Sequence, residues 1–230
     1  MSTVPVVAQR QPSVDKSRAR QFDALLLVLA IISFAGFVAL TAALLNHIVF
    51  SFDQPILSLV RQLDGWPIVW QVVSQSANFP LIAIGVGLIV WLVWKHHYRE
   101  AIVVVLMLVA VTAGSEGVKQ LTARARPAGN GDGIPGVVYS YPSGHILECL
   151  TILGAVAIRF WRTSEHRRLR ILLVIAVLLE VILVGIGRMA LNEHYPTDIL
   201  GGLFAAIAAL SLYAWITRRG GWADQFGASG

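Results

Sequence analysis

Six long stretches of the chain are apolar, with few charged side chains inside them. The first contains 22 uncharged residues, enough for a helix to cross about 30 Å of hydrocarbon. It is too long for a signal peptide, and no clear small-residue cleavage site follows it, so we interpret it as a retained span. The six predicted spans are residues 24–45, 79–94, 101–119, 145–161, 170–187 and 197–216.

The segment between the first two spans, residues 47–78, has a mixed pattern that predicts one or two short amphipathic helices in the first outer loop. A plain surface connector and a lid over a lipid entrance both remain open. Gly65-Trp66-Pro67 breaks the pattern. The apolar residues at helical spacing are Ile56, Leu57, Leu59, Val60 and Leu63.

The pattern as a whole predicts an all-α bundle of six transmembrane helices. We expect a flexible cytoplasmic tail at residues 1–21, one membrane domain at 22–217 and a cytoplasmic C-terminal tail at 218–230. No internal repeat and no soluble second domain is apparent in the sequence.

Composition agrees with this pattern. Hydrophobic residues make up 56% of the 230 residues, charged residues 13%, and the mean hydropathy is +0.69. A soluble chain of this size cannot hide so much apolar surface from water. The chain has a single cysteine, Cys149, and therefore no internal disulfide, so cysteine usage does not indicate the redox compartment.

The basic residues predict the orientation. With six spans, thirteen of the 18 Lys and Arg residues fall on the side of the two termini and five on the other side. The positive-inside rule then places both termini in the cytoplasm of a multi-pass cell-membrane protein. This membrane orientation accounts for most of the basic residues and hence for the net charge of +5, so we exclude nucleic acid as a partner.

Three polar segments lie on the outer side. They contain basic residues, although the positive-inside rule predicts few basic residues on that side. Lys119, Arg126 and Arg188 supply three positive charges, and Arg can hold a phosphate through two parallel hydrogen bonds. Ser143 and Gly144 precede a span, where the N–H groups of a helix N-terminus favour an anion. Together these residues predict a phosphate cage.

Two histidines and a carboxylate complete the chemistry. His194 and Asp198 are four residues apart, which on a helix places them on one face. The carboxylate can hold one imidazole nitrogen as N–H and leave the other free to attack. His145, from another span, can then protonate a leaving oxygen.

These motifs resemble the signature of the type 2 phosphatidic acid phosphatase superfamily, which reads Lys-x6-Arg-Pro, Pro-Ser-Gly-His and Ser-Arg-x5-His-x3-Asp. The resemblance covers roughly residues 101–216, and Gly187 stands where the family usually has Ser. The matching residues are Lys119, Arg126-Pro127, Pro142-Ser143-Gly144-His145, Arg188, His194 and Asp198.

The resemblance implies a role for each residue. His194 would be the nucleophile that forms a phosphohistidine, and His145 the general acid. Lys119, both arginines, Ser143 and Gly144 would bind phosphate, with no metal and no cofactor needed. The substrate would be a lipid phosphate taken from the bilayer; the oligomeric state is not indicated.

The family resemblance leaves the substrate open. If the source is bacterial, undecaprenyl diphosphate is the expected substrate, because it exposes its diphosphate on the outer face of the cell membrane. Phosphatidylglycerol phosphate, phosphatidic acid and lipid A phosphate remain alternatives. So do a transporter, which would release no phosphate, and a vanadate-dependent haloperoxidase, which would oxidise halide.

Three further polar residues fall near the motifs. We expect Glu116 to pair with Lys119 and Glu148 to hydrogen-bond His145, each from three positions away. Arg124 matches no motif position, and we interpret it as a headgroup contact or a surface cation.

Overall fold

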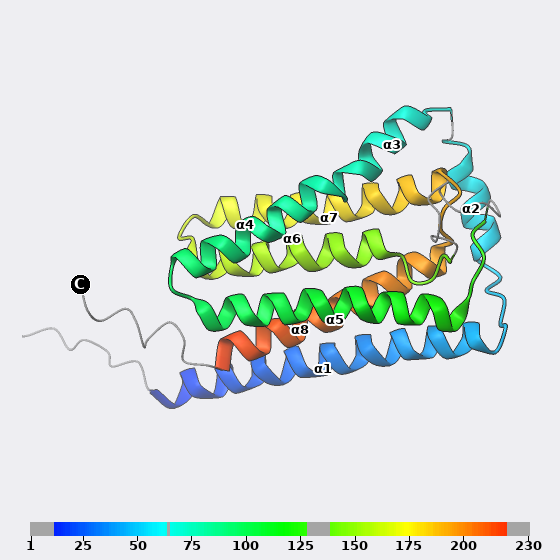
Figure 1. The fold of residues 1–230 in the computed structure, drawn as a ribbon. Coiled ribbons are helices and arrows are strands. Elements are labelled where there is room, and N and C mark those ends of the chain that lie inside the picture. Colours follow the sequence, from blue (N-terminus) through cyan, green and yellow to red (C-terminus); the bar gives the residue numbers. More distant parts are fainter. Residues whose placement is uncertain (1–11, 64, 128–138, 220–230) are drawn as a thin grey trace, which may run out of the picture.

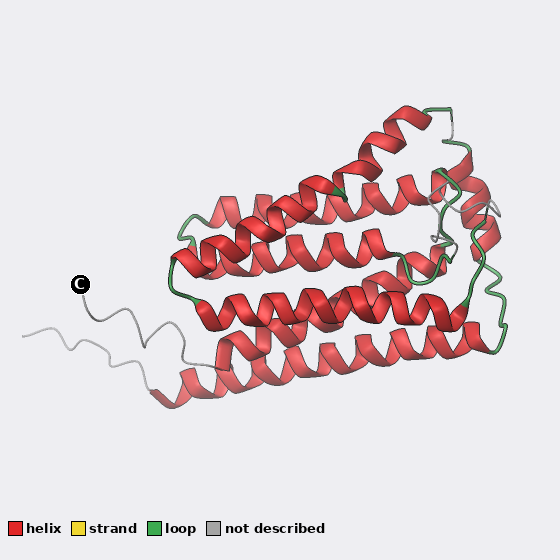
Figure 2. Ribbon diagram, viewed as in Figure 1, coloured by secondary structure: helices red, strands yellow, loops and turns green. Residues whose placement is uncertain are grey.

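The structure of the chain, a computed structural model, describes residues 12–63, 65–127 and 139–219. Within these residues the regular secondary structure is helical, with one isolated β-bridge between Ala125 and Tyr139 (Figure 2). The expected all-α class is confirmed. The helices are α1 (Pro12–Leu45), α2 (Asp53–Arg61), α3 (Pro67–Ser76), α4 (Phe79–Trp94), α5 (Tyr98–Thr122), α6 (Gly144–Thr163), α7 (Arg167–Ala190) and α8 (Pro196–Arg219).

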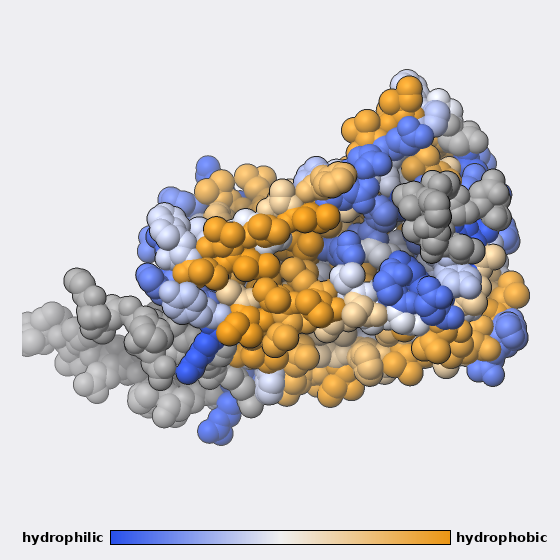
Figure 3. Space-filling view, in the orientation of Figure 1, coloured by the Kyte–Doolittle hydropathy of each residue, from blue (hydrophilic) through white to orange (hydrophobic). Residues whose placement is uncertain are grey.

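In the described part of the chain, six helical segments are long and apolar enough to cross a membrane, as the sequence predicted. They lie side by side in one bundle (Figure 1). Large apolar side chains on these helices face outward, and Figure 3 shows the broad apolar surface they form. Such a surface suits lipid rather than water, so the chain is a multi-pass membrane protein.

The first helix is longer than its apolar run. It begins at Pro12, so residues 12–21 of the expected tail are helical. The apolar run marks the part inside hydrocarbon, whereas Ala, Arg, Gln and Lys before it are good helix formers that continue the helix. Similarly, α8 reaches Arg219. The rest of the two expected tails, residues 1–11 and 220–230, lies outside the described residues.

The second candidate span begins at Pro67 rather than at residue 79. Only α2 stands apart as a short helix in the first loop, because α3 leads directly into α4 through a break at Ala77 and Asn78. Pro80 accounts for the break, since its ring lacks an N–H and clashes with the carbonyl four residues earlier.

The two ends of the bundle differ (Figure 1). One end holds the start of α1 and the end of α8. The other end, which we call the site end, holds α2, the C-terminal ends of α5 and α7, and the N-terminal ends of α6 and α8. All three polar motifs therefore lie at the site end.

Candidate active site

The Pro-Ser-Gly-His turn packs directly on the first turns of α8. The backbone N–H of Ser143 donates to the carbonyl oxygen of Asp198 at 3.1 Å. A Cβ atom at Gly202 would lie 2.8 Å from the Ser143 carbonyl oxygen, and one at Gly201 would lie 2.4 Å from the ring of Tyr141. The two glycines therefore permit an approach that a side chain would block.

Tyr141 anchors the same turn to α1. Its ring is fully buried and stacks on Phe37, with 6.1 Å between ring centroids. Its hydroxyl lies 3.2 Å from the Thr41 hydroxyl and donates to the Phe37 carbonyl at 3.3 Å. Burial raises the pKa of Tyr141 to about 12, so the phenol stays protonated.

His194 and Asp198 meet as the sequence predicted, but not along a helix. Nδ1 of His194 lies 3.5 Å from Oδ2 of Asp198, at the outer limit of hydrogen-bond distance. His194 precedes α8, whereas Asp198 lies in its first turn and accepts a 2.7 Å bond from the Tyr195 N–H. This contact resembles half of a capping box, and the helix dipole favours the carboxylate there.

His194 is almost completely buried, at 2% exposure. Burial lowers the pKa of its imidazole from 6.5 to about 4; Asp198 opposes this shift, while Arg188 and Arg126 add to it. At neutral pH the imidazole is therefore uncharged, which leaves a ring nitrogen with a lone pair for attack.

His145 lies in the first turn of α6, next to the same groups. Its Nε2 is buried without a hydrogen-bond partner among the described residues. The charges of Arg188, Lys119 and Arg126 and the ring of His194 all act on it electrostatically. The two imidazoles therefore share the same cationic neighbours, Arg188 and Arg126.

The three cations predicted for the cage converge there. Lys119 Nζ lies 3.5 Å from the position of a Cβ atom on Gly144, next to the N-terminus of α6. Arg126 and Arg188 are both buried, and both approach Glu193: Arg126 Nη1 lies 3.8 Å from Glu193 Oε2, and Arg188 pairs with the same oxygen. A carboxylate thus occupies the space between the two guanidinium groups.

The Ser143 hydroxyl is also available at this place. It is fully buried and has no hydrogen-bond partner among the described residues. Ser143 is the N-cap of α6, so its hydroxyl and the first N–H groups of the helix lie together. An anion held there would meet all of these donors.

The expectations for the neighbouring acidic residues had different outcomes. Glu116 pairs with Lys119 at 2.6 Å, as predicted. For Glu148, the carboxylate accepts a hydrogen bond of 3.5 Å from the Thr112 hydroxyl of α5.

Arg124 was wrongly interpreted as a headgroup contact or a surface cation. Its side chain is 16% exposed and donates at 2.6 Å to Oδ1 of Asp198. Two more residues that sequence reasoning missed are Asp53 and Ser74; Ser74 accepts a 2.9 Å bond from Arg188. Neither lies in a motif, and only the proximity of α2 and α3 to α7 and α8 reveals them.

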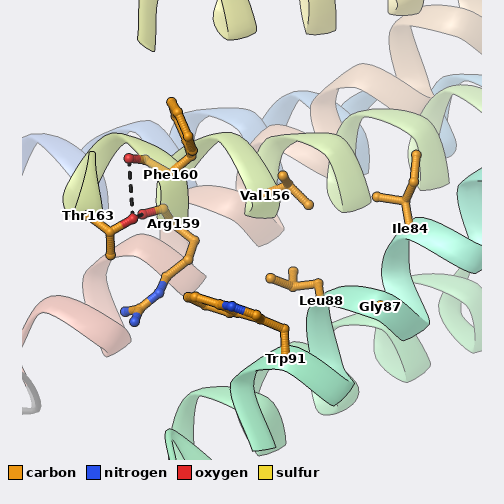
Figure 4. Close-up of a pocket in the computed structure, with 8 residues that line it drawn as sticks. All are labelled: Ile84, Gly87, Leu88, Trp91, Val156, Arg159, Phe160 and Thr163. Carbon is orange, nitrogen blue, oxygen red and sulfur yellow. Dashed lines mark hydrogen bonds between the residues drawn. The ribbon is translucent and has the colours of Figure 1, made fainter. Parts of the chain in front are cut away.

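Two cavities lie away from the motif residues. Figure 4 shows one of about 320 Å³ between α4 and α6, where Arg159 lies over Trp91. A second, of about 670 Å³, is lined by apolar residues of α1, α6, α7 and α8, with Arg162 and Arg218. Neither is lined by a motif residue, so the site is identified by the chemistry of its side chains.

A solved structure has the same fold. It is described as the crystal structure of the first transmembrane PAP2 type phosphatidylglycerolphosphate phosphatase from Bacillus subtilis. The two chains are 18% identical, with a TM-score of 0.63, over 80% of this chain and 94% of the other. At this identity the match concerns the fold alone.

The sequence match to a family is more specific. Residues 99–222, more than half of the chain, match the PAP2 superfamily. This range contains the three motifs and the helices α5 to α8, apart from the first residue of α5. The chain therefore belongs to the PAP2 superfamily, as an integral membrane lipid phosphatase.

Proposed function

We propose that the chain hydrolyses a phosphate or diphosphate group of a lipid through a phosphohistidine, without a metal. The observation that supports this is the convergence of two imidazoles, three cations and a helix N-terminus at one point. Such preorganised charges stabilise the negative charge that develops on a phosphoryl group in its transition state.

The first step forms a bond between Nε2 of His194 and phosphorus. Asp198 holds Nδ1 as N–H and balances the positive charge that grows on the ring. The bond between phosphorus and the lipid oxygen breaks, and His145 donates a proton to that oxygen. For a lipid monophosphate, the leaving group is the lipid alcohol. For a lipid diphosphate, it is the lipid monophosphate.

The second step regenerates the enzyme. A water molecule attacks phosphorus, the bond to Nε2 of His194 breaks, and His145 takes a proton from the water. Lys119, Arg126 and Arg188, with the Ser143 hydroxyl and the N–H groups at Gly144, hold the phosphoryl oxygens through both steps. Inorganic phosphate leaves.

For the substrate we propose undecaprenyl diphosphate, taken from the outer leaflet of a cell membrane. The site end carries the smaller share of the basic residues, five of 18, and by the positive-inside rule this supports an orientation in which the site end faces outward. The tail can remain in the bilayer while the diphosphate enters the cage. Phosphatidylglycerol phosphate is the second candidate, because the Bacillus subtilis protein with this fold is described as its phosphatase.

The test is phosphate release from a panel of lipid phosphates by the purified protein in vesicles. We expect undecaprenyl diphosphate to give the highest kcat/KM and His194→Ala to abolish release. His166→Ala, in the exposed loop between α6 and α7, is the control and should keep full activity. Transport of these lipids by the purified protein without release of phosphate would contradict the proposal. Full activity of His194→Ala would also contradict it.

The orientation has a separate test. Val49, 86% exposed between α1 and α2, and the exposed Glu165 lie at opposite ends of the bundle. A cysteine at position 49 should react with an impermeant thiol reagent on intact cells, and a cysteine at position 165 only after lysis. The native Cys149 is buried and gives little background. The reverse pattern would overturn the orientation.

A further inference from the structure

Arg124 bridges two buried carboxylates at the site end. Its Nη1 donates to Oδ1 of Asp198 at 2.6 Å, and its Nη2 donates to Oδ2 of Asp53 at 2.6 Å. The guanidinium also lies over the ring of Tyr195, at 4.2 Å from the centroid. Each terminal nitrogen of Arg124 is therefore bonded to a buried carboxylate of the protein.

Asp53 connects this bridge to the backbone of α8. It lies in the first turn of α2, is 3% exposed, and accepts a 2.9 Å bond from the Thr197 N–H and a 2.7 Å bond from the Thr197 hydroxyl. The N-terminus of α8 is thus capped by a carboxylate from another helix. Asp53 lies outside residues 99–222, the part that matches the superfamily.

The consequence for Asp198 is that both of its oxygens are held. Arg124 fixes Oδ1, and the Tyr195 N–H fixes Oδ2, the oxygen that faces Nδ1 of His194. Charge-assisted hydrogen bonds of this kind are short and directional, so the plane of the carboxylate cannot turn. The position of the His194 ring depends on that plane.

We propose that Arg124 and Asp53 are positioning residues that hold the Asp198–His194 pair in the geometry for attack on phosphorus. The inference rests on the proposed function. Arg is required because a flat guanidinium reaches both carboxylates at once, whereas the ammonium of Lys is a single point of charge. In this proposal neither residue binds the phosphate, because Arg124 is bonded to two carboxylates and Asp53 is itself an anion, so their loss lowers turnover rather than substrate affinity.

The test compares steady-state kinetics of Arg124→Gln, Arg124→Lys and Asp53→Asn in the full-length protein, with a lipid phosphate that the wild type hydrolyses. Arg124→Gln should lower kcat by about 10- to 100-fold, as expected for a misplaced reacting group, with KM changed by less than about threefold. Arg124→Lys should recover part of the loss, because it can satisfy one carboxylate. Asp53→Asn should lower kcat less than Arg124→Gln, and it serves as the readout if Arg124→Gln does not fold.

The chain offers a matched control in Arg159. It is also 16% exposed, pairs with the buried Glu100 at 2.9 Å and lies over a tryptophan, but at the opposite end of the bundle. Arg159→Gln should lower thermal stability as much as Arg124→Gln and leave kcat within about twofold of the wild type. This separates loss of an ion pair from loss of positioning.

The outcomes are distinct. Wild-type kcat in Arg124→Gln and Asp53→Asn would overturn the inference and leave the proposed function standing. A raised KM with unchanged kcat would mean that Arg124 binds phosphate directly, which also overturns it. Loss of kcat in Arg159→Gln equal to that in Arg124→Gln would reduce the effect to stability. Absence of phosphate release by the wild type would refute the proposed function itself.

Discussion

The backbone N–H of Ser143 bonds to the carbonyl oxygen of Asp198 at 3.1 Å, across 55 positions of the sequence (198 − 143). This bond joins the turn before α6, which holds the anion-binding groups, to the first turn of α8, which holds the carboxylate beside His194. The cage and the attacking pair are therefore parts of one rigid junction.

Gly202→Ala should disturb that junction. The new Cβ atom would lie 2.8 Å from the Ser143 carbonyl oxygen, so the turn or α8 has to shift. We expect a loss of about 1–3 kcal/mol in stability, typical of overpacking, together with a fall in kcat. Thermal unfolding and lipid phosphatase assays measure both. The control is Gly87→Ala on α4, where nothing lies within 4 Å of the new atom; a Gly202→Ala protein equal to it in both measurements would contradict the prediction.

Glu193→Gln should make the cage bind anions more tightly. The carboxylate lies between Arg126 and Arg188, so an incoming phosphate competes with it for the two guanidinium groups. Removing the charge should lower the inhibition constant of orthovanadate by about tenfold, which corresponds to about 1.4 kcal/mol. The exposed Glu165→Gln is the control. Weaker inhibition in Glu193→Gln would indicate that the carboxylate holds the arginines in place instead.

The buried His194 should make stability depend on pH on the acid side. The pKa of its imidazole is about 4 in the folded chain and near 6.5 when exposed, with burial as the main cause. Below pH 6.5 the unfolded chain therefore binds a proton that the folded chain does not. Stability should fall as the pH decreases from 6.5 through 4.

The measurement is the thermal midpoint from pH 7.5 to pH 4.5 in the same detergent. His194→Gln lacks the titrating group, so its midpoint should fall less steeply over this interval. Identical pH profiles for the two proteins would refute the assignment of this effect to His194.

Activity should survive EDTA. The charge of the phosphoryl group is balanced by Lys119, Arg126 and Arg188, which is the task a divalent cation performs in metal-dependent phosphatases. Phosphate release with and without excess EDTA measures this. Complete loss of activity that Mg²⁺ restores would contradict the metal-free mechanism.

The sequence predicted what depends on local pattern. Apolar runs located the six spans, because hydrocarbon tolerates few charges along a helix. The positions of the motifs relative to these spans predicted that His145, His194 and Asp198 lie at one end of the bundle. The expectation of a shared helix face for the last two was wrong in detail, since His194 lies in the turn before α8 and the capping contact of Tyr195 places the carboxylate.

What the sequence did not reveal depends on contacts between distant segments. From the sequence alone, Arg124 looks like a surface cation. Its partner Asp53 lies 71 positions earlier, and only the fold brings the two side chains together. Likewise, the start of the second span was misplaced because α3 is amphipathic, with its polar Ser74 turned toward Arg188. A pattern along one helix does not identify the partner on another helix.

The capping of α8 by Asp53 also limits how this protein can be divided. The first turn of α8 obtains a hydrogen-bond acceptor from Asp53, which lies 46 positions before the superfamily region begins (99 − 53). A fragment cut to the matching region would expose that turn to lipid or solvent without its acceptor. Chimaeras that exchange substrate preference among such proteins should therefore be joined upstream of α2, so that donor and acceptor come from the same parent.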